Sequence, residues 1–198
     1  MIKYYLFILL FFSFNSLSAM DKKPYHHIYK DGKLHAFRNL EGGPKRDPNF
    51  KWDWKVFREE KKKLKIDYPP EHVIDKQLVL KNLEKHKSDS YVMWLDHASF
   101  IIKLGDTTII TDPVFEKNYG PMVFGPKKFI DSPLTLEEIP KINLFLLTHN
   151  HYDHMSIRTI KNFPYKNAKV LVPLKLGKYF TRNGYKKDAV REMDWFDK

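Results

Sequence analysis

The sequence predicts an α/β fold in which helices pack on a partly parallel β-sheet. From Tyr91 onward the chain contains short apolar runs rich in β-branched and aromatic residues, which is typical of strands. After Ile142 such runs alternate with segments of helical spacing, a pattern that favours parallel strands joined by helices. The length of 198 residues suits one domain, alone or behind an N-terminal export signal.

Residues 1–19 are predicted to be a signal peptide. Lys3 supplies a positive charge, an apolar run follows from Tyr4 to Phe14, and small residues precede a cleavage site after Ala19. The apolar run is shorter than the roughly 18 residues that a membrane span needs. We therefore expect export to the periplasm or the exterior, with a retained membrane anchor as the alternative.

The overall charge is strongly basic, with 35 Lys and Arg against 24 Asp and Glu and a net charge of +11. The lysines are scattered, which favours a solvated basic surface and, beyond it, weak contact with an anionic membrane. No nucleic-acid-binding motif is visible, so nucleic acid is not an expected partner. The chain has no cysteine, so its core or a metal must hold the fold without disulfides.

Residues 20–90 are expected to form an extension before the main domain at residues 91–198. The first part, to residue 54, mixes Gly, Pro and aromatic residues without a clear period and reads as irregular. Two segments of helical composition follow, at residues 55–65 and 74–87, separated by two prolines.

The main domain begins with three strands that form an antiparallel meander and continues with alternating elements. The turn at Gly105 and Asp106 joins the second and third of these strands. The expected strands are residues 91–95, 99–104, 107–111, 142–148 and 169–173 and a last one beginning near 188, with helices at 156–163 and 174–184.

A cluster of metal-binding residue types, "THNHYDH", follows directly after the apolar strand at residues 142–148. In extended chain, residues two apart point the same way, so His149 and His151 can hold one metal together. Asp153 continues on that face and His154 follows where the chain must turn, which indicates a second metal held by these two residues. Imidazole with carboxylate suits zinc, with iron or manganese as alternatives. The other interpretation is a solvent-exposed polar loop.

This motif resembles that of the metallo-β-lactamase superfamily, whose fold is an αββα sandwich with a binuclear metal site. The segments "HHIYKDGKLHAFRN", "WLDHASFIIKLGDTTIITDPVF", "FGPKKFIDSPLTLEEIPKINLFLLTHNHYDHM" and "DWFD" are similar to the branch that contains N-acylphosphatidylethanolamine-hydrolysing phospholipase D. The resemblance covers residues 25–198. It implies a zinc-dependent hydrolase with two zinc ions that acts on a phospholipid or another phosphodiester. A lactonase or other ester hydrolase of the same fold would share these ligands.

The resemblance also assigns roles to individual residues. It implies that His149, His151, Asp153 and His154 bind metal, and that Asp153 and His97 are catalytic. Asp112 would orient a ligand histidine by accepting a hydrogen bond from its ring. Taken alone, His97 and Asp112 are residue types common in structural turns. The family usually has Gly at the position of Asp96, where a carboxylate is expected either to disturb the turn before His97 or to face solvent.

The number of ligands raises a second expectation. Each metal needs about four donors, yet no histidine follows His154, and the later acids are only Asp188, Glu192, Asp194 and Asp197. The resemblance places the motif near the middle of the domain, so we expect about the first half of the sandwich here, as a truncated product, a fragment or part of a split enzyme. An inactive half-domain is the alternative function. Such a chain should bind zinc weakly, lack turnover alone, and aggregate, form a homodimer or need a C-terminal companion chain.

Overall fold

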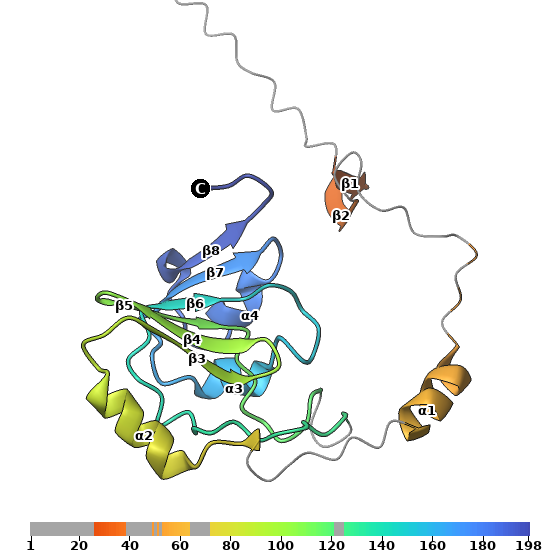
Figure 1. The fold of residues 1–198 in the computed structure, drawn as a ribbon. Helices are drawn as coiled ribbons and strands as arrows, with labels where there is room; N and C mark the ends of the chain where they lie inside the picture. The colour runs from red at the N-terminus through yellow and green to blue at the C-terminus, as the bar shows by residue number, and fades with distance from the viewer. Residues whose placement is uncertain (1–25, 39–48, 50, 52, 64–71, 121–124) are drawn as a thin grey trace, which may run out of the picture. The chain divides into compact units, whose positions relative to one another are not determined.

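The computed structural model describes residues 26–38, 49, 51, 53–63, 72–120 and 125–198 (Figure 1). These belong to two compact units, Met1–Lys65 and Ile66–Lys198. The predicted signal peptide at residues 1–19 lies outside the described residues. Within the described part of the chain, no helix has the length and apolar character needed to cross a membrane.

The first unit contains a β-hairpin where irregular chain was expected. Strand β1 (His27–Lys30) pairs antiparallel with β2 (Lys33–Phe37). The two connecting residues, Asp31 and Gly32, have φ angles of 50° and 72°, as a two-residue hairpin turn with left-handed backbone requires. The expectation of irregular chain is therefore wrong here, because an Asp-Gly pair between two β-prone runs favours a tight hairpin.

Both predicted helices of the extension form, each behind an aspartate that caps it. In α1 (Trp54–Lys63) the carboxylate of Asp53 accepts a hydrogen bond from the Lys55 amide at 2.8 Å. In α2 (Lys76–Lys85) Asp75 plays the same part. Helix α2 contributes the buried Val79 to the core of the second unit. Helix α2 therefore belongs to the compact unit Ile66–Lys198, and the domain start at residue 91 stays a prediction.

A six-stranded sheet forms the centre of the second unit, in the order β3-β4-β5-β6-β7-β8 (Figure 1). The first three strands are antiparallel, and the pairs from β5 to β8 are parallel. The prediction of a partly parallel sheet in an α/β fold is therefore confirmed. The strands are β3 (Tyr91–Asp96), β4 (Ser99–Leu104), β5 (Thr107–Thr111), β6 (Leu144–Leu146), β7 (Lys169–Pro173) and β8 (Val190–Met193).

One face of this sheet is packed against helices. Phe145 of β6 is 1% exposed, and its ring contacts those of Phe163 and Phe180 with centroids 5.1 and 5.0 Å apart. Phe163 directly follows α3 (Ile157–Asn162) as its C-cap, and Phe180 belongs to α4 (Gly177–Thr181). A short 3-10 helix (Lys187–Ala189) leads into β8. The aromatic stack thus joins both helices to the middle of the sheet.

The opposite face of the sheet is apolar but much more open. Val92 and Trp94 of β3 are 68% and 49% exposed. Their partners in β4, Ile102 and Phe100, are half-buried. Apolar side chains of β3 and β4 thus remain partly or largely exposed on this face.

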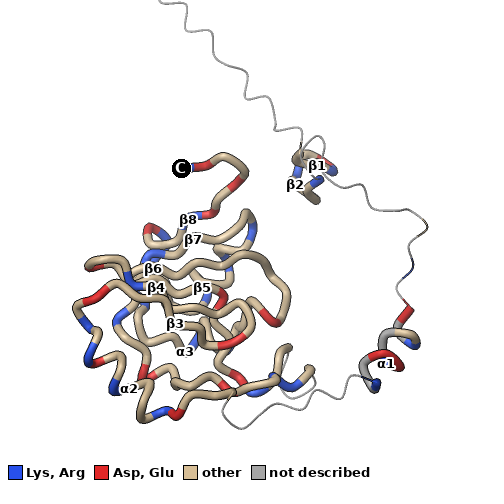
Figure 2. Tube along the Cα trace, viewed as in Figure 1, with Lys and Arg blue, Asp and Glu red and all other residues tan. Residues whose placement is uncertain are grey.

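Charged residues are spread over the second unit. Figure 2 shows Lys and Arg positions along α2 and in the loops around the sheet, with Asp and Glu positions between them. This distribution agrees with a solvated basic surface.

Candidate metal centre

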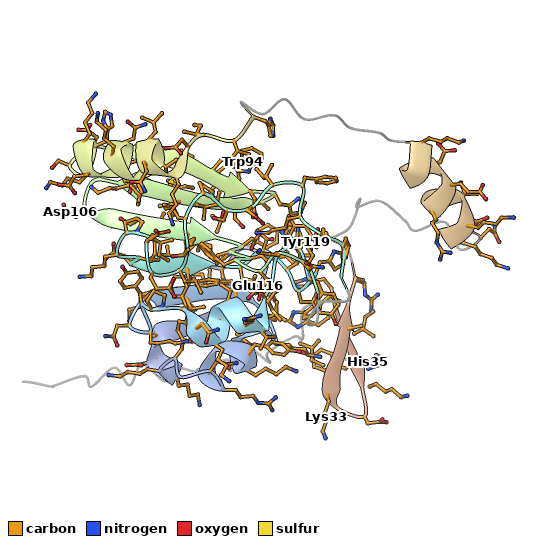
Figure 3. The ribbon with its side chains drawn as sticks, turned by 90° about the horizontal axis from the view of Figure 1, so that it is seen from below. Lys33, His35, Trp94, Asp106, Glu116 and Tyr119 are labelled. Atoms are coloured by element: carbon orange, nitrogen blue, oxygen red, sulfur yellow. The ribbon has the colours of Figure 1, made fainter. Side chains whose placement is uncertain are left out.

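The predicted site residues gather at one end of the sheet, where β5 and β6 end and β3 turns into β4. Asp112 directly follows β5, and the "THNHYDH" run begins two residues after β6. Figure 3 shows Trp94 and Tyr119 toward this end, whereas Asp106, in the β4–β5 turn, lies at the other. The end of a sheet where parallel strands finish is a common place for a ligand site, because several loops meet there.

Asp112 fixes the start of the run and also one of its histidines. Its buried carboxylate accepts hydrogen bonds from the backbone amide and the hydroxyl of Thr148, at 2.7 and 2.6 Å. It also accepts one from Nδ1 of His154 at 2.9 Å. Because Nδ1 is engaged in this way, Nε2 is the nitrogen of His154 left for a metal. The structure thus places Asp112 where it can orient a ligand histidine.

A tight turn brings the end of the run back toward its beginning. The carbonyl of His151 accepts hydrogen bonds from the amides of His154 and Met155, at 3.0 and 2.8 Å. Met155 is buried in the core, and Ser156 then caps α3 by accepting from the Thr159 amide at 3.0 Å. The turn expected at His154 is present, and a buried side chain anchors it.

His97 comes from the β3–β4 turn and meets the run from another strand pair. Its Nε2 lies 3.0 Å from Oδ2 of Asp153, and its ring centroid lies 5.0 Å from that of His154. The candidate ligand atoms of these three residues all lie within 4.8 Å of one another. The structure therefore groups His97 with Asp153 and His154.

His149 and His151 form a second, adjacent pair. Their ring centroids are 4.5 Å apart, and the His149 ring lies 3.9 Å from that of His154. Burial, and after it the nearby His154 and His151, lower the pKa of His149. A lowered pKa favours neutral imidazole, which is the form that binds metal.

The structure contradicts the alternative in which Asp96 faces solvent. Asp96 neither faces solvent nor is left without a partner, because the Lys128 ammonium donates hydrogen bonds to its carboxylate and to the Val114 carbonyl. Both charged side chains are 2% exposed. No local pattern indicates this buried ion pair, because its partners lie 32 residues apart and Lys128 is one of many lysines.

Tyr119 is a further residue at the site that the sequence did not reveal. Its ring centroid lies 5.7 Å from that of His97, and the Lys128 ammonium lies 5.8 Å from the Tyr119 ring. Burial, and after it the charges of Asp96 and Asp153, raise the pKa of Tyr119 to about 12. The phenol therefore remains protonated near neutral pH and can donate a hydrogen bond.

An open cleft of about 770 Å³ adjoins the run and is the candidate space for a substrate. A second cavity of about 360 Å³, between α2 and β3, is largely apolar and holds none of the predicted ligands. The cleft is lined by Tyr119, Gly120, Gly125, Pro126, Asn150, His151, Tyr152 and Asp153.

Comparison with known proteins identifies the class. Residues 91–196 match the β-lactamase superfamily domain, and the chain belongs to this family. The similar proteins include some that are called metal-dependent hydrolases. A metal is therefore implied, and imidazoles grouped with a carboxylate beside an open cleft are a donor set that fits one.

The similarity to individual relatives extends over only part of each relative's length. The N-acyl-phosphatidylethanolamine-hydrolyzing phospholipase D 1 of Caenorhabditis elegans is 29% identical over 62% of this chain and 37% of its own. A metal-dependent hydrolase of Caldivirga maquilingensis is 35% identical over 33% of this chain and 23% of its own. The chain thus spans about a quarter to a third of the length of these relatives. The crystal structure of a possible metal-dependent hydrolase from Veillonella parvula aligns with a TM-score of 0.42 and 20% identity, over 55% of this chain and 45% of that chain.

Proposed function

We propose that the protein is a zinc-dependent phosphodiesterase that hydrolyses a phosphodiester bond in a phospholipid. The observation that carries this proposal is the convergence of His149, His151, Asp153 and His154 at the end of the sheet, with Asp112 holding His154. The similarity to the nematode phospholipase D supports the choice of a lipid phosphodiester.

Each residue has a distinct part in the proposed reaction. His149 and His151 hold one zinc ion, and Asp153 and His154 hold a second. When bound, zinc polarises the phosphoryl oxygen and makes water a better nucleophile at neutral pH. The Asp153 carboxylate would orient that water, and Nε2 of His97 lies 3.0 Å from it. Asp112 accepts the Nδ1 proton of His154 and fixes its ring.

Tyr119 supplies a neutral hydrogen-bond donor at the rim of the cleft. With a pKa raised to about 12, its hydroxyl keeps its proton and can donate to an anionic phosphodiester oxygen. A donor that carried negative charge would instead repel that substrate.

The proposed substrate lies in a membrane, so the protein must reach a membrane surface. The protein is exported by its N-terminal segment and approaches an anionic membrane surface, which the net charge of +11 supports. Co-sedimentation with anionic vesicles, weakened by added salt and absent with neutral vesicles, is the expected result. Equal binding to both kinds of vesicle would contradict an electrostatic contact.

The function is tested with two classes of substrate and a matched pair of variants. With added zinc, the protein should hydrolyse bis-p-nitrophenyl phosphate and N-acylphosphatidylethanolamine in mixed micelles as a homodimer or together with its companion chain, and not as a lone monomer. Asp153→Asn should abolish turnover, whereas His35→Ala, in an exposed histidine of β2, should leave it unchanged (Figure 3). Hydrolysis of carboxyl esters or lactones without phosphodiester turnover would contradict the proposal. The homodimer or companion chain expected from the sequence stays a prediction. If it is right, turnover should be lost when the protein is kept monomeric and without the companion chain.

A further inference from the structure

We infer that His97 is a third protein ligand, which completes with Asp153 and His154 a site for one divalent metal ion of the zinc type. Its donors are Nε2 of His97, Oδ2 of Asp153 and Nε2 of His154. The inference rests on the proposed metal chemistry but not on which bond the protein hydrolyses. It adds a donor from a different strand pair to a site that the sequence motif supplies with only two.

The distances between the donors suit tetrahedral coordination. Metal–ligand bonds of about 2.0–2.1 Å place two donors of a tetrahedron roughly 3.4 Å apart. Oδ2 of Asp153 lies 3.0 Å from Nε2 of His97 and 3.7 Å from Nε2 of His154, so the two distances bracket that value. The same carboxylate oxygen takes part in both contacts. An ion can therefore be held with side-chain movements of a few tenths of an ångström.

The chemical identity of the three donors also suits a zinc ion. Asp112 occupies Nδ1 of His154 at 2.9 Å, which leaves Nε2 as the available nitrogen. His97 presents its Nε2 to the same carboxylate oxygen. Two imidazoles and one carboxylate leave a fourth tetrahedral position, and Asp153 lines the open cleft. Three protein donors with one open position is the composition of a catalytic zinc site.

The backbone of His97 is held in a conformation that needs support. Its φ angle is 33°, in the left-handed region that costs energy for a residue other than glycine. The indole of Trp94, labelled in Figure 3, donates to the His97 carbonyl at 3.0 Å. Just before His97, the buried pair of Asp96 and Lys128 fixes the end of β3. These contacts hold the imidazole beside Asp153, as a ligand in a preformed site requires.

Zinc affinity tests the inference without reference to turnover. His97→Asn is the main variant, because asparagine tolerates left-handed backbone while its shorter side chain cannot bring a nitrogen to the same place. We expect competition with a chromophoric chelator to show zinc binding weakened at this site by at least about 100-fold, since loss of even an outer hydrogen-bond partner costs roughly 10- to 100-fold. His35→Ala, which removes an exposed histidine of the first unit, should bind zinc like the wild type.

Cobalt supplies a second readout. Co²⁺ in a tetrahedral site absorbs strongly in the visible range, and this band should be present in the wild type and lost in His97→Asn. The thermal unfolding of the metal-free variant should match that of the wild type, which excludes a folding defect as the cause. An unchanged zinc affinity and cobalt band in His97→Asn would overturn the inference. Zinc binding that depends on His97, without phosphodiester turnover, would instead support this site and count against the proposed function.

Discussion

The two halves of the "THNHYDH" run differ in how the rest of the protein supports them. Asp153 and His154 are held by residues from other strands, His97 in the β3–β4 turn and Asp112 at the end of β5. Among the described residues, the His149 ring lies beside those of His151 and His154, and its Nδ1 lies 3.0 Å from the hydroxyl of Thr148, which Asp112 holds. One half is therefore held directly by residues of other strands, and the other through Thr148 and local chain geometry. The spacing of the motif does not distinguish the two halves, whereas their tertiary contacts do.

This difference has a consequence for metal binding. A ligand held by a buried hydrogen bond loses little conformational freedom when it binds an ion, so its site is preorganised. The half with Asp153 and His154 should therefore bind the first ion, and the half with His149 and His151 should follow with lower affinity.

The largest effect is expected at the buried ion pair of Asp96 and Lys128, next to His97 in the chain. In Lys128→Met the Asp96 carboxylate stays buried without a counter-charge, so the free energy of unfolding should fall by about 3–5 kcal/mol. The double variant Asp96→Ala, Lys128→Met should recover most of that loss, because it leaves no unpaired charge. Urea denaturation measures both.

A matched control separates burial from charge. Lys87 and Glu84 of α2 also form an ion pair, but their side chains are 67% and 73% exposed. Lys87→Met should therefore change the unfolding free energy by no more than about 1 kcal/mol. Equal losses in Lys87→Met and Lys128→Met would show that the buried pair does not support the site as described.

The next largest effect is expected at Asp112. Asp112→Ala removes the acceptor of the His154 ring and of both Thr148 groups, so His154 should lose its direct support and His149 its support through Thr148. Zinc affinity should fall roughly 10- to 100-fold, as measured by chelator competition. Asp112→Asn keeps the size of the side chain, can still accept from Thr148, and should lose less. An Asp112→Ala protein that folds and binds zinc like the wild type would remove the distinction between the two halves.

A smaller effect is expected where the run joins α3. Ser156→Ala deletes the hydrogen bond to the Thr159 amide and should lower the free energy of unfolding by about 1 kcal/mol. Asp75→Ala, which uncaps α2 away from the site, should cost a similar amount and leave zinc affinity unchanged. Only the Ser156 variant should also weaken zinc binding, since it loosens the turn after His154. Identical zinc affinities in the two variants would contradict this link.

The smallest effect concerns the pH dependence of the less supported half. Burial lowers the pKa of His149 below its usual 6.5, so in that pH range the unfolded chain binds more protons than the folded protein. The unfolding free energy of the metal-free protein should therefore fall as the pH drops below 6.5 toward the folded pKa. His149→Ala should reduce this slope in urea denaturation between about pH 7.5 and about pH 5.5. An unchanged slope would argue against the burial of His149.

Much of the fold could be predicted because its elements carry local signals. The β-prone runs at residues 91–111 and 142–173 and the serine cap of α3 each occupy a few neighbouring positions, and each formed as expected. The hairpin at Asp31 and Gly32 departs from this rule, because β1 has a register shift at Ile28 and Tyr29 and its burial does not alternate.

The site was predictable only in part for a physical reason. The run from His149 to His154 is contiguous, so its composition alone indicated a metal. The buried pair of Asp96 and Lys128, and the approach of Tyr119 to His97, depend on how loops fold back over the sheet. Contacts of that kind leave no periodic pattern in the sequence, and a single lysine or tyrosine has no distinguishing composition.

The most direct test of the two-halves account is the anomalous diffraction of zinc in crystals grown with less than one equivalent of the metal. The account predicts a single strong peak within about 2.0–2.2 Å of Nε2 of His97, Oδ2 of Asp153 and Nε2 of His154. A second peak at His149 and His151 should appear only with excess zinc. A first peak on His149 and His151, with His97 turned away from the metal, would contradict the account.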